Sequence, residues 1–68
     1  MPHLSQQPFT FDFTSDALRA ALEIEKGATE SYRYETIFVF NTEREIIGTQ
    51  VRVMDEEGFF EAYVAGEA

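Results

Sequence analysis

Cysteine is absent from this chain of 68 residues, and histidine is nearly absent. Without cysteine the chain cannot form disulfides, thiolate zinc sites, iron–sulfur clusters or a cysteine nucleophile. The only histidine is His3, so catalytic triads and histidine-rich metal sites are excluded as well. The four glycines lie too far apart to build a phosphate-binding loop. These absences predict that the protein is not an enzyme and that it has no cofactor, no metal and no catalytic residues.

Long apolar runs are also missing. No stretch approaches the ~20 apolar residues of a membrane-spanning helix. The N-terminal segment lacks the cationic and apolar regions of a secretory signal. We therefore expect a cytoplasmic protein. Residues 1–7 are predicted to form a flexible leader, and residues 8–68 a single domain near the lower size limit for independent folding.

Basic residues are scarce, because five lysines and arginines stand against thirteen aspartates and glutamates, for a net charge of -8. This excess disfavours direct binding to nucleic acid or to an anionic membrane, and it favours a basic protein partner. With 44% hydrophobic and 15% aromatic residues, the chain is too apolar for a disordered acidic segment. A solubilising surface or a halophilic trait would also explain the acidity, and the sequence leaves these origins open.

The N-terminal third predicts one strand and one helix. The alternation of Phe9, Phe11 and Phe13 predicts a strand with three rings on one face. Ser15 is expected as the N-cap of a helix, and Gly27 as its left-handed C-terminal stop. The predicted helix carries an apolar stripe made of Leu18, Ala21 and Leu22, flanked by Ala17 and Ile24.

The remaining residues predict an antiparallel meander. Its three strands cover residues 32–40, 45–54 and 59–65, and the connections 41–44 and 55–58 have hairpin length. Gly58 suits a left-handed turn position, and Gly48 indicates a bulge or the close approach of another backbone. The predicted fold is therefore α+β, in the order β-α-β-β-β, with one helix packed on a four-stranded, mostly antiparallel sheet. Whether the first strand joins the second or the fourth is left open.

Parity along the strands predicts which side chains share a face. Pairing Phe40 with Glu45 and Met54 with Phe59 places Arg52 across from both Arg33 and Glu61. The face expected to meet the helix holds Tyr34, Thr36, Phe38, Phe40, Ile47, Thr49, Val51, Val53, Phe60, Ala62 and Val64. One helix covers only one face, so the other face stays open, and its mixed composition is typical of an interface. The predicted partner interface comprises Arg33, Glu35, Ile37, Val39, Ile46, Arg52, Met54, Phe59, Glu61 and Tyr63.

Acidic side chains at the two hairpin tips are expected to form a rim around this interface. They are Glu43, Glu45, Asp55, Glu56 and Glu57. The leading prediction is a small non-catalytic protein-binding module that inhibits or antagonises a basic, nucleic-acid-binding protein. In its small size, acidity and lack of cysteine, the chain is similar to phage-encoded anti-defence proteins, such as anti-CRISPR and antirestriction inhibitors. The similarity is one of size and charge, and no motif supports it. The alternatives are a structural homodimer formed through the open sheet face and an antitoxin-like regulator.

Overall fold

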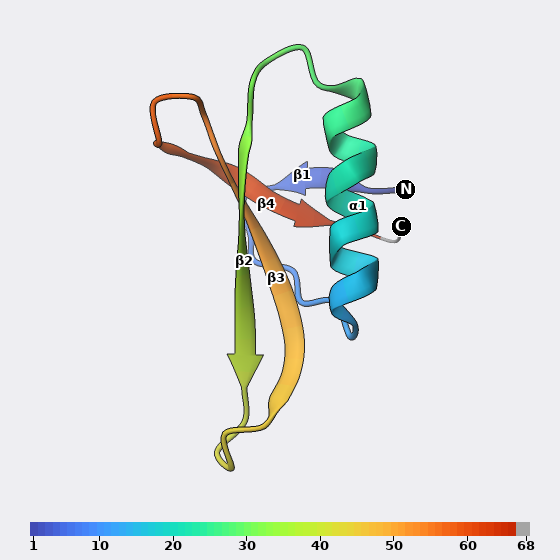
Figure 1. Cartoon of the computed structure of the whole chain (residues 1–68), viewed down its shortest axis with the longest axis vertical. Coiled ribbons are helices and arrows are strands. Elements are labelled where there is room, and N and C mark those ends of the chain that lie inside the picture. The colour runs from blue at the N-terminus through green and yellow to red at the C-terminus, as the bar shows by residue number, and fades with distance from the viewer. Residues whose placement is uncertain (67–68) are drawn as a thin grey trace.

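The computed structural model describes residues 1–66. Its elements are β1 (His3–Ser5), α1 (Thr14–Gly27), β2 (Arg33–Phe40), β3 (Ile46–Met54) and β4 (Phe60–Ala65). The four strands form one antiparallel sheet in the order β1-β4-β3-β2, and α1 packs on one side of it (Figure 1). This arrangement confirms the predicted α+β fold with one helix on a four-stranded antiparallel sheet.

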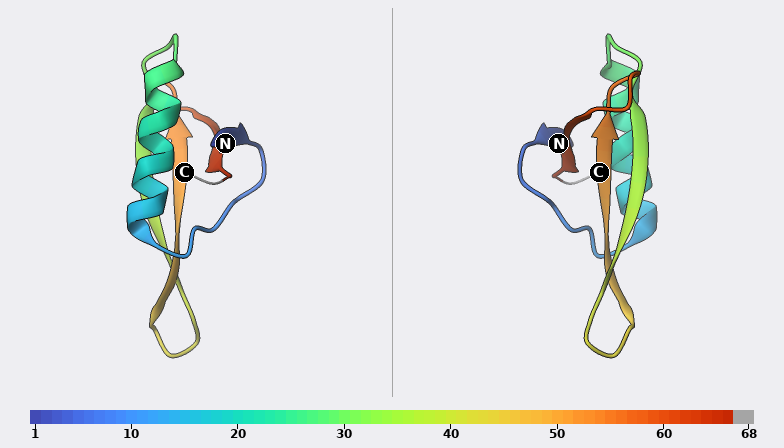
Figure 2. Two further views of the ribbon diagram at one scale, coloured as in Figure 1. Left: turned by 90° about the vertical axis from the view of Figure 1, so that its right-hand side faces the viewer. Right: turned by 90° about the vertical axis from the view of Figure 1, so that its left-hand side faces the viewer.

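The sheet is strongly twisted. Strands β2 and β3 run along the longest dimension of the molecule, whereas β4 and β1 cross them (Figures 1 and 2). Only the last part of β3 pairs with β4, from Arg52 opposite Tyr63 to Met54 opposite Phe60. The first strand joins the sheet beside β4, which settles the position that the sequence left open.

The strand predicted around Phe9, Phe11 and Phe13 is wrong. The first strand is β1, which lies inside the segment expected to be a leader. Phe11 makes a single bridge to Thr49, with backbone hydrogen bonds of 2.8 and 2.9 Å. Thr49 lies on the part of β3 that does not pair with β4. The rings of Phe9 and Phe11 pack edge to face at 4.8 Å, and Phe11 is buried while Phe13 is exposed. The three rings therefore do not share one face.

Gly48 confirms the predicted close approach. A Cβ at this position would collide with the Thr10 methyl group and would lie 3.0 Å from the Phe11 carbonyl oxygen. The predicted bulge is present as well, because Val39 faces Gly48 but Phe40 faces Ile46. Glycine is needed here because the backbone of Thr10 and Phe11 runs directly beside β3.

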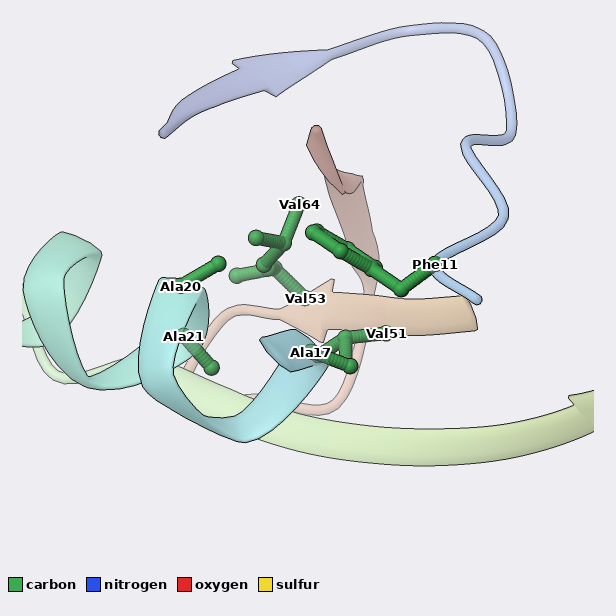
Figure 3. Packing of buried hydrophobic residues seen from close by; sticks show 7 residues of the cluster. All are labelled: Phe11, Ala17, Ala20, Ala21, Val51, Val53 and Val64. Atoms are coloured by element: carbon green, nitrogen blue, oxygen red, sulfur yellow. The ribbon is translucent and has the colours of Figure 1, made fainter. Parts of the chain in front are cut away.

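The core consists mainly of small side chains. Ala17, Ala20 and Ala21 of α1 pack against Val51, Val53 and Val64, and the Phe11 ring closes one side, as Figure 3 shows. In the described residues, valine is the largest side chain that is fully buried. Alanines allow the helix to approach β3 and β4 closely.

Three details of the helix differ from the prediction. Leu18 and Leu22, expected in the buried stripe, are more than half exposed. The N-cap is Phe13 rather than Ser15, and no side chain caps this end. Gly27 is the last helical residue and does not adopt a positive φ. The stripe shifted because the alanine face, and not the leucine face, allows the closest contact with the sheet.

The predicted sheet faces are largely confirmed, but both predicted registers are wrong by two residues. Arg52 lies opposite Glu35 instead of Arg33, and opposite Tyr63 instead of Glu61. A shift of two residues leaves every side chain on its face, so parity alone could not detect it. Each shift has two causes. The turn is one residue longer than predicted, because Phe40 pairs with Ile46 and Met54 with Phe60, and one inserted residue beside each of these pairs adds the second step.

Phe60 was expected in the core, and this expectation is wrong. The register change beside Met54 places Phe60 directly opposite that residue, on the open face. Its ring lies 5.1 Å from the ring of Tyr63 in an edge-to-face contact, and it is 46% exposed.

Candidate interaction surfaces

The sheet face opposite α1 is uncovered in the described residues. None of the ten predicted interface residues is buried. Five of them, namely Arg33, Glu35, Arg52, Met54 and Tyr63, are joined by direct cross-strand pairing. Phe60 adds a ring that the sequence did not assign to this face. We call these six residues the open-face patch.

The other predicted interface residues are dispersed. Ile37 and Val39 lie farther along β2 on the same face as Glu35, by strand alternation. Ile46 was expected on the open face, and this expectation is wrong: it lies across from Phe40, which places it on the side of the sheet that faces α1. Phe59 is at the β3–β4 tip, and Glu61 is the unpaired residue at the second register shift. The structure therefore brings half of the predicted set together directly.

Arg52 occupies the centre of the open-face patch. Its guanidinium group donates a hydrogen bond to Glu35, and the two side chains form an ion pair. Arg52 Nε is buried and has no hydrogen-bond partner in the described residues. The two charges are therefore paired within one chain, while the aliphatic part of Arg52 lies between Glu35 and the ring of Tyr63.

The two hairpin tips have the same turn geometry. Asn41 Oδ1 accepts hydrogen bonds from the N–H groups of Glu43 and Glu45, at 2.8 and 3.0 Å. Asp55 Oδ1 accepts equivalent bonds from Glu57 and Phe59, both at 2.9 Å. Asp55 therefore holds the turn together rather than projecting its charge into solvent.

The predicted acidic rim is not one continuous feature. Glu43 and Glu45 lie at the β2–β3 tip, and Asp55, Glu56 and Glu57 lie at the β3–β4 tip, at opposite ends of the molecule (Figure 1). Only the second group lies next to the open-face patch, because Met54 and Phe60 flank it in the sequence. The first group is remote from that patch.

A hollow of about 570 Å³ lies between the α1–β2 connection and the β3–β4 tip. Its lining contains five carboxylates and no basic residue: Thr29, Glu30, Ser31, Asp55, Glu56, Glu57 and Glu61. We call it the acidic hollow. Glu30 and Glu61 both line this hollow, and partial burial together with these two carboxylates raises the pKa of Tyr32 above its ordinary value. Sequence reasoning did not assign Glu30 to a site, because its position near β4 depends on the path of the connection.

The second uncovered surface is at the far end of the β2–β3 hairpin. The hydroxyl groups of Thr14 and Thr49 are hydrogen-bonded at 2.8 Å, so α1 begins at the level of Thr49. Phe38 pairs with Thr49, and the hairpin continues beyond it (Figure 1). We call residues 37–47 the apolar arm. Four large side chains on it are about half exposed: Phe38 44%, Phe40 55%, Ile46 57% and Ile47 54%.

The sequence placed Phe38, Phe40 and Ile47 in the core, and the structure exposes them. A comparison of the lengths of the helix and the strand would have predicted this exposure. A helix of 14 residues is about 21 Å long, whereas a strand of nine residues spans about 30 Å. One helix of this length cannot cover the whole of β3.

Residues 1–66 contain no group of three or more His, Asp or Glu side chains positioned to hold a metal ion. His3 lies on β1, where its Nδ1 is 3.3 Å from the Met1 carbonyl oxygen. Over the same residues, α1 is the sole helix, and it is too short and too polar to cross a membrane.

Comparisons with protein-family models, curated proteins and solved structures found no match to this chain. The fold and the surfaces described above are therefore the basis on which a function is proposed.

Proposed function

We propose that this chain is a non-catalytic protein-binding module that inhibits or antagonises a basic, nucleic-acid-binding protein. The observation that supports this proposal most directly is the acidic hollow beside the open-face patch. Five carboxylates without a basic neighbour line the hollow, and aromatic and aliphatic side chains continue from it across the sheet. A basic protein surface with an apolar centre is complementary to this combination.

The two parts of the surface contribute in different ways. Met54, Phe60 and Tyr63 supply apolar area that gains free energy when water is excluded. The carboxylates of the acidic hollow attract cations over about 8 Å at physiological ionic strength, which increases the association rate. A protein that occupies the nucleic-acid-binding surface of its target in this way would compete with the nucleic acid.

Binding to a defined pool of basic proteins tests the proposal. The immobilised chain is exposed to the heparin-retained fraction of a lysate of its source cells, at low and at high salt. We expect retention of a basic protein at low salt, release at high salt, and displacement of labelled DNA from the retained protein by the free chain. Retention that does not depend on salt would contradict the electrostatic part of the proposal.

Two variants of equal net charge locate the site. The first combines Glu30→Gln, Glu57→Gln and Glu61→Gln, and it leaves Asp55 in place because that side chain holds the turn. Exposed charge pairs are worth about 0.2–1 kcal/mol each, so affinity should fall roughly ten-fold. The control neutralises three acids outside the hollow: Asp12→Asn, Glu23→Gln and Glu43→Gln. Equal losses in both variants would mean that only net charge matters.

A homodimer formed through the open-face patch has less support. That model depended on arginine and glutamate side chains pairing between two copies. In the structure, Arg52 and Glu35 pair within one chain. Two of the four charges that such a dimer would use are therefore already paired within one chain, which leaves Arg33 and Glu61 for contacts between copies.

A further inference from the structure

Strand β2 is an open edge of the sheet. It pairs with β3 on one side, and no strand of residues 1–66 pairs with its other side. Edge strands are normally protected by proline, lysine, short length or a bulge. β2 has eight residues and contains neither proline nor lysine, and the inserted residue of this hairpin is in β3. The hydrogen-bonding edge of β2 is therefore available to another strand.

Uncovered apolar side chains flank this edge on the side of the sheet that faces α1. Tyr34 donates a hydrogen bond to Glu25 at 2.6 Å, which places Glu25 on the side of α1 nearest β2. Leu18 and Leu22 share the helix face of Glu25, seven and three residues before it. Both leucines are more than half exposed. Together with the exposed rings of the apolar arm, they are uncovered apolar side chains on the same side of the sheet as α1.

We infer that a second copy of this chain occupies this surface, by antiparallel pairing of β2 with β2 about a two-fold axis. The resulting sheet would be continuous across both copies, with the two helices on the same face. A two-fold axis at Ile37 places Phe38 opposite Thr36 of the second copy, and Phe40 opposite its Tyr34. Residues with the same parity then share a face, as the sheet requires.

Charge favours a second copy over a basic partner at this surface. Residues 36–42 and 46–51 contain no charged side chain, although the whole chain carries a net charge of -8. A basic protein would find no carboxylate along this part of the hairpin. Within the paired segment 34–40, Glu35 is the only charged side chain, and the two-fold axis places it opposite Val39 of the second copy, so no like charges are directly opposed.

The available area is sufficient for a stable dimer. Leu18, Leu22, Phe38, Phe40 and Ile47 are each about half exposed. At about 100 Å² for each, they offer roughly 500 Å² of apolar surface per copy, before the backbone edge of β2 is counted. Complete burial of these side chains in both copies would give about 1,000 Å², which is the lower limit for a specific protein interface.

Sedimentation of one variant and one matched control tests the inference. We expect the wild-type chain to sediment as a dimer at micromolar concentrations and the Phe40→Lys variant to sediment as a folded monomer. Phe59→Lys makes the same chemical change at a phenylalanine that is 66% exposed on the other hairpin tip, and it should remain dimeric. A monomeric wild-type chain would overturn the inference. So would two variants that behave alike, whether both are dimers or both are monomers.

Disulfide cross-linking provides a second readout, because the chain contains no natural cysteine. At the two-fold axis, Ile37→Cys should oxidise rapidly to a covalent dimer, since directly opposed residues lie about 4.5–5.5 Å apart. Glu43→Cys at the arm tip is the control, because the two tips point in opposite directions and lie about 40 Å apart. Equal cross-linking of both variants would contradict the proposed pairing. This surface is separate from the acidic hollow, so failure here leaves the proposed function intact.

Discussion

The two hairpin tips allow a quantitative test, because the same turn is built with glycine at one tip and with arginine at the other. Gly58 has a φ of 91° and Arg44 a φ of 65°, both in the left-handed region. That conformation costs a residue with a side chain about 1–2 kcal/mol. Glycine avoids this cost, but it loses about 0.5–1 kcal/mol through the greater entropy of its unfolded chain. The difference predicts that Arg44→Gly stabilises the fold by about 0.5–1 kcal/mol, and that Gly58→Ala destabilises it by a similar amount.

Thermal unfolding followed by far-ultraviolet circular dichroism measures both effects. In a domain of this size, 1 kcal/mol shifts the Tm by about 4–8 °C, so the predicted changes are well resolved. A Cβ at Gly58 would have no heavy atom within 4 Å, so steric contact does not contribute to the expected loss. Arg44→Ala is the matched control, because it removes the charge and retains the left-handed cost.

The two possible failures have different meanings. If Arg44→Ala raises the Tm as much as Arg44→Gly, removal of charge explains the gain, and backbone strain at this turn is refuted. If Arg44→Gly has no effect while Gly58→Ala destabilises the protein, the tip of the apolar arm opens before the core unfolds. In that case the arm is not part of the cooperative unit in the isolated chain.

Two further changes test the packing of the connection and the helix. Gly48→Ala should cost about 1–3 kcal/mol in urea unfolding, because the added methyl group displaces the segment around Phe11, and a second substitution, Thr10→Ala, should recover part of the loss. Tyr34→Phe should cost about 1 kcal/mol through loss of the hydrogen bond to Glu25. Partial burial and Glu25 raise the pKa of Tyr34 above its ordinary value of 10.0. The protonated phenol therefore contributes its full stabilisation of the folded state below about pH 10. This contribution is lost as the pH rises above 10 toward the raised pKa of the folded state. Wild-type stability should therefore fall more steeply than that of Tyr34→Phe above about pH 10.

Local sequence signals predicted most of the secondary structure correctly. The predicted strands at 32–40, 45–54 and 59–65 differ from β2, β3 and β4 by one residue at their starts. Alternating side chains and short polar turns determine these elements, and both are visible within a few residues. The left-handed position of Gly58 was predicted for the same reason.

Properties that depend on distant contacts were predicted less well. Each register is shifted by two residues, one from a longer turn and one from an inserted residue, and the alternation of hydrophobic side chains does not change under a shift of two. The strand at Phe9–Phe13 failed because β1 occupies the free edge of β4, which leaves Phe11 with one bridge to β3. Neither the pairing partner nor the length of that pairing is encoded in the local pattern.

In the candidate sites too, features set by the local sequence were predicted and features set by distant contacts were not. The side chains of the open-face patch were identified from alternation, except Phe60, whose face depends on the bulge beside Met54. Glu30 joins the acidic hollow only because the α1–β2 connection passes near β4. The exposure of the apolar arm depends on where α1 begins relative to β3, which the Thr14–Thr49 hydrogen bond marks.

The distribution of large and small side chains connects the fold to its proposed assembly. Alanine and valine form most of the core, whereas five large side chains remain about half exposed: Leu18, Leu22, Phe38, Phe40 and Ile47. About 500 Å² of uncovered apolar surface corresponds to roughly 12 kcal/mol at 25 cal/mol per Å². Only part of this gross amount would appear as affinity, because association costs translational, rotational and side-chain entropy. Burial of that surface against a second copy would add large side chains to a core that consists mainly of alanine and valine. The short helix with an alanine face is therefore better suited to one half of a larger two-layer structure than to an isolated domain.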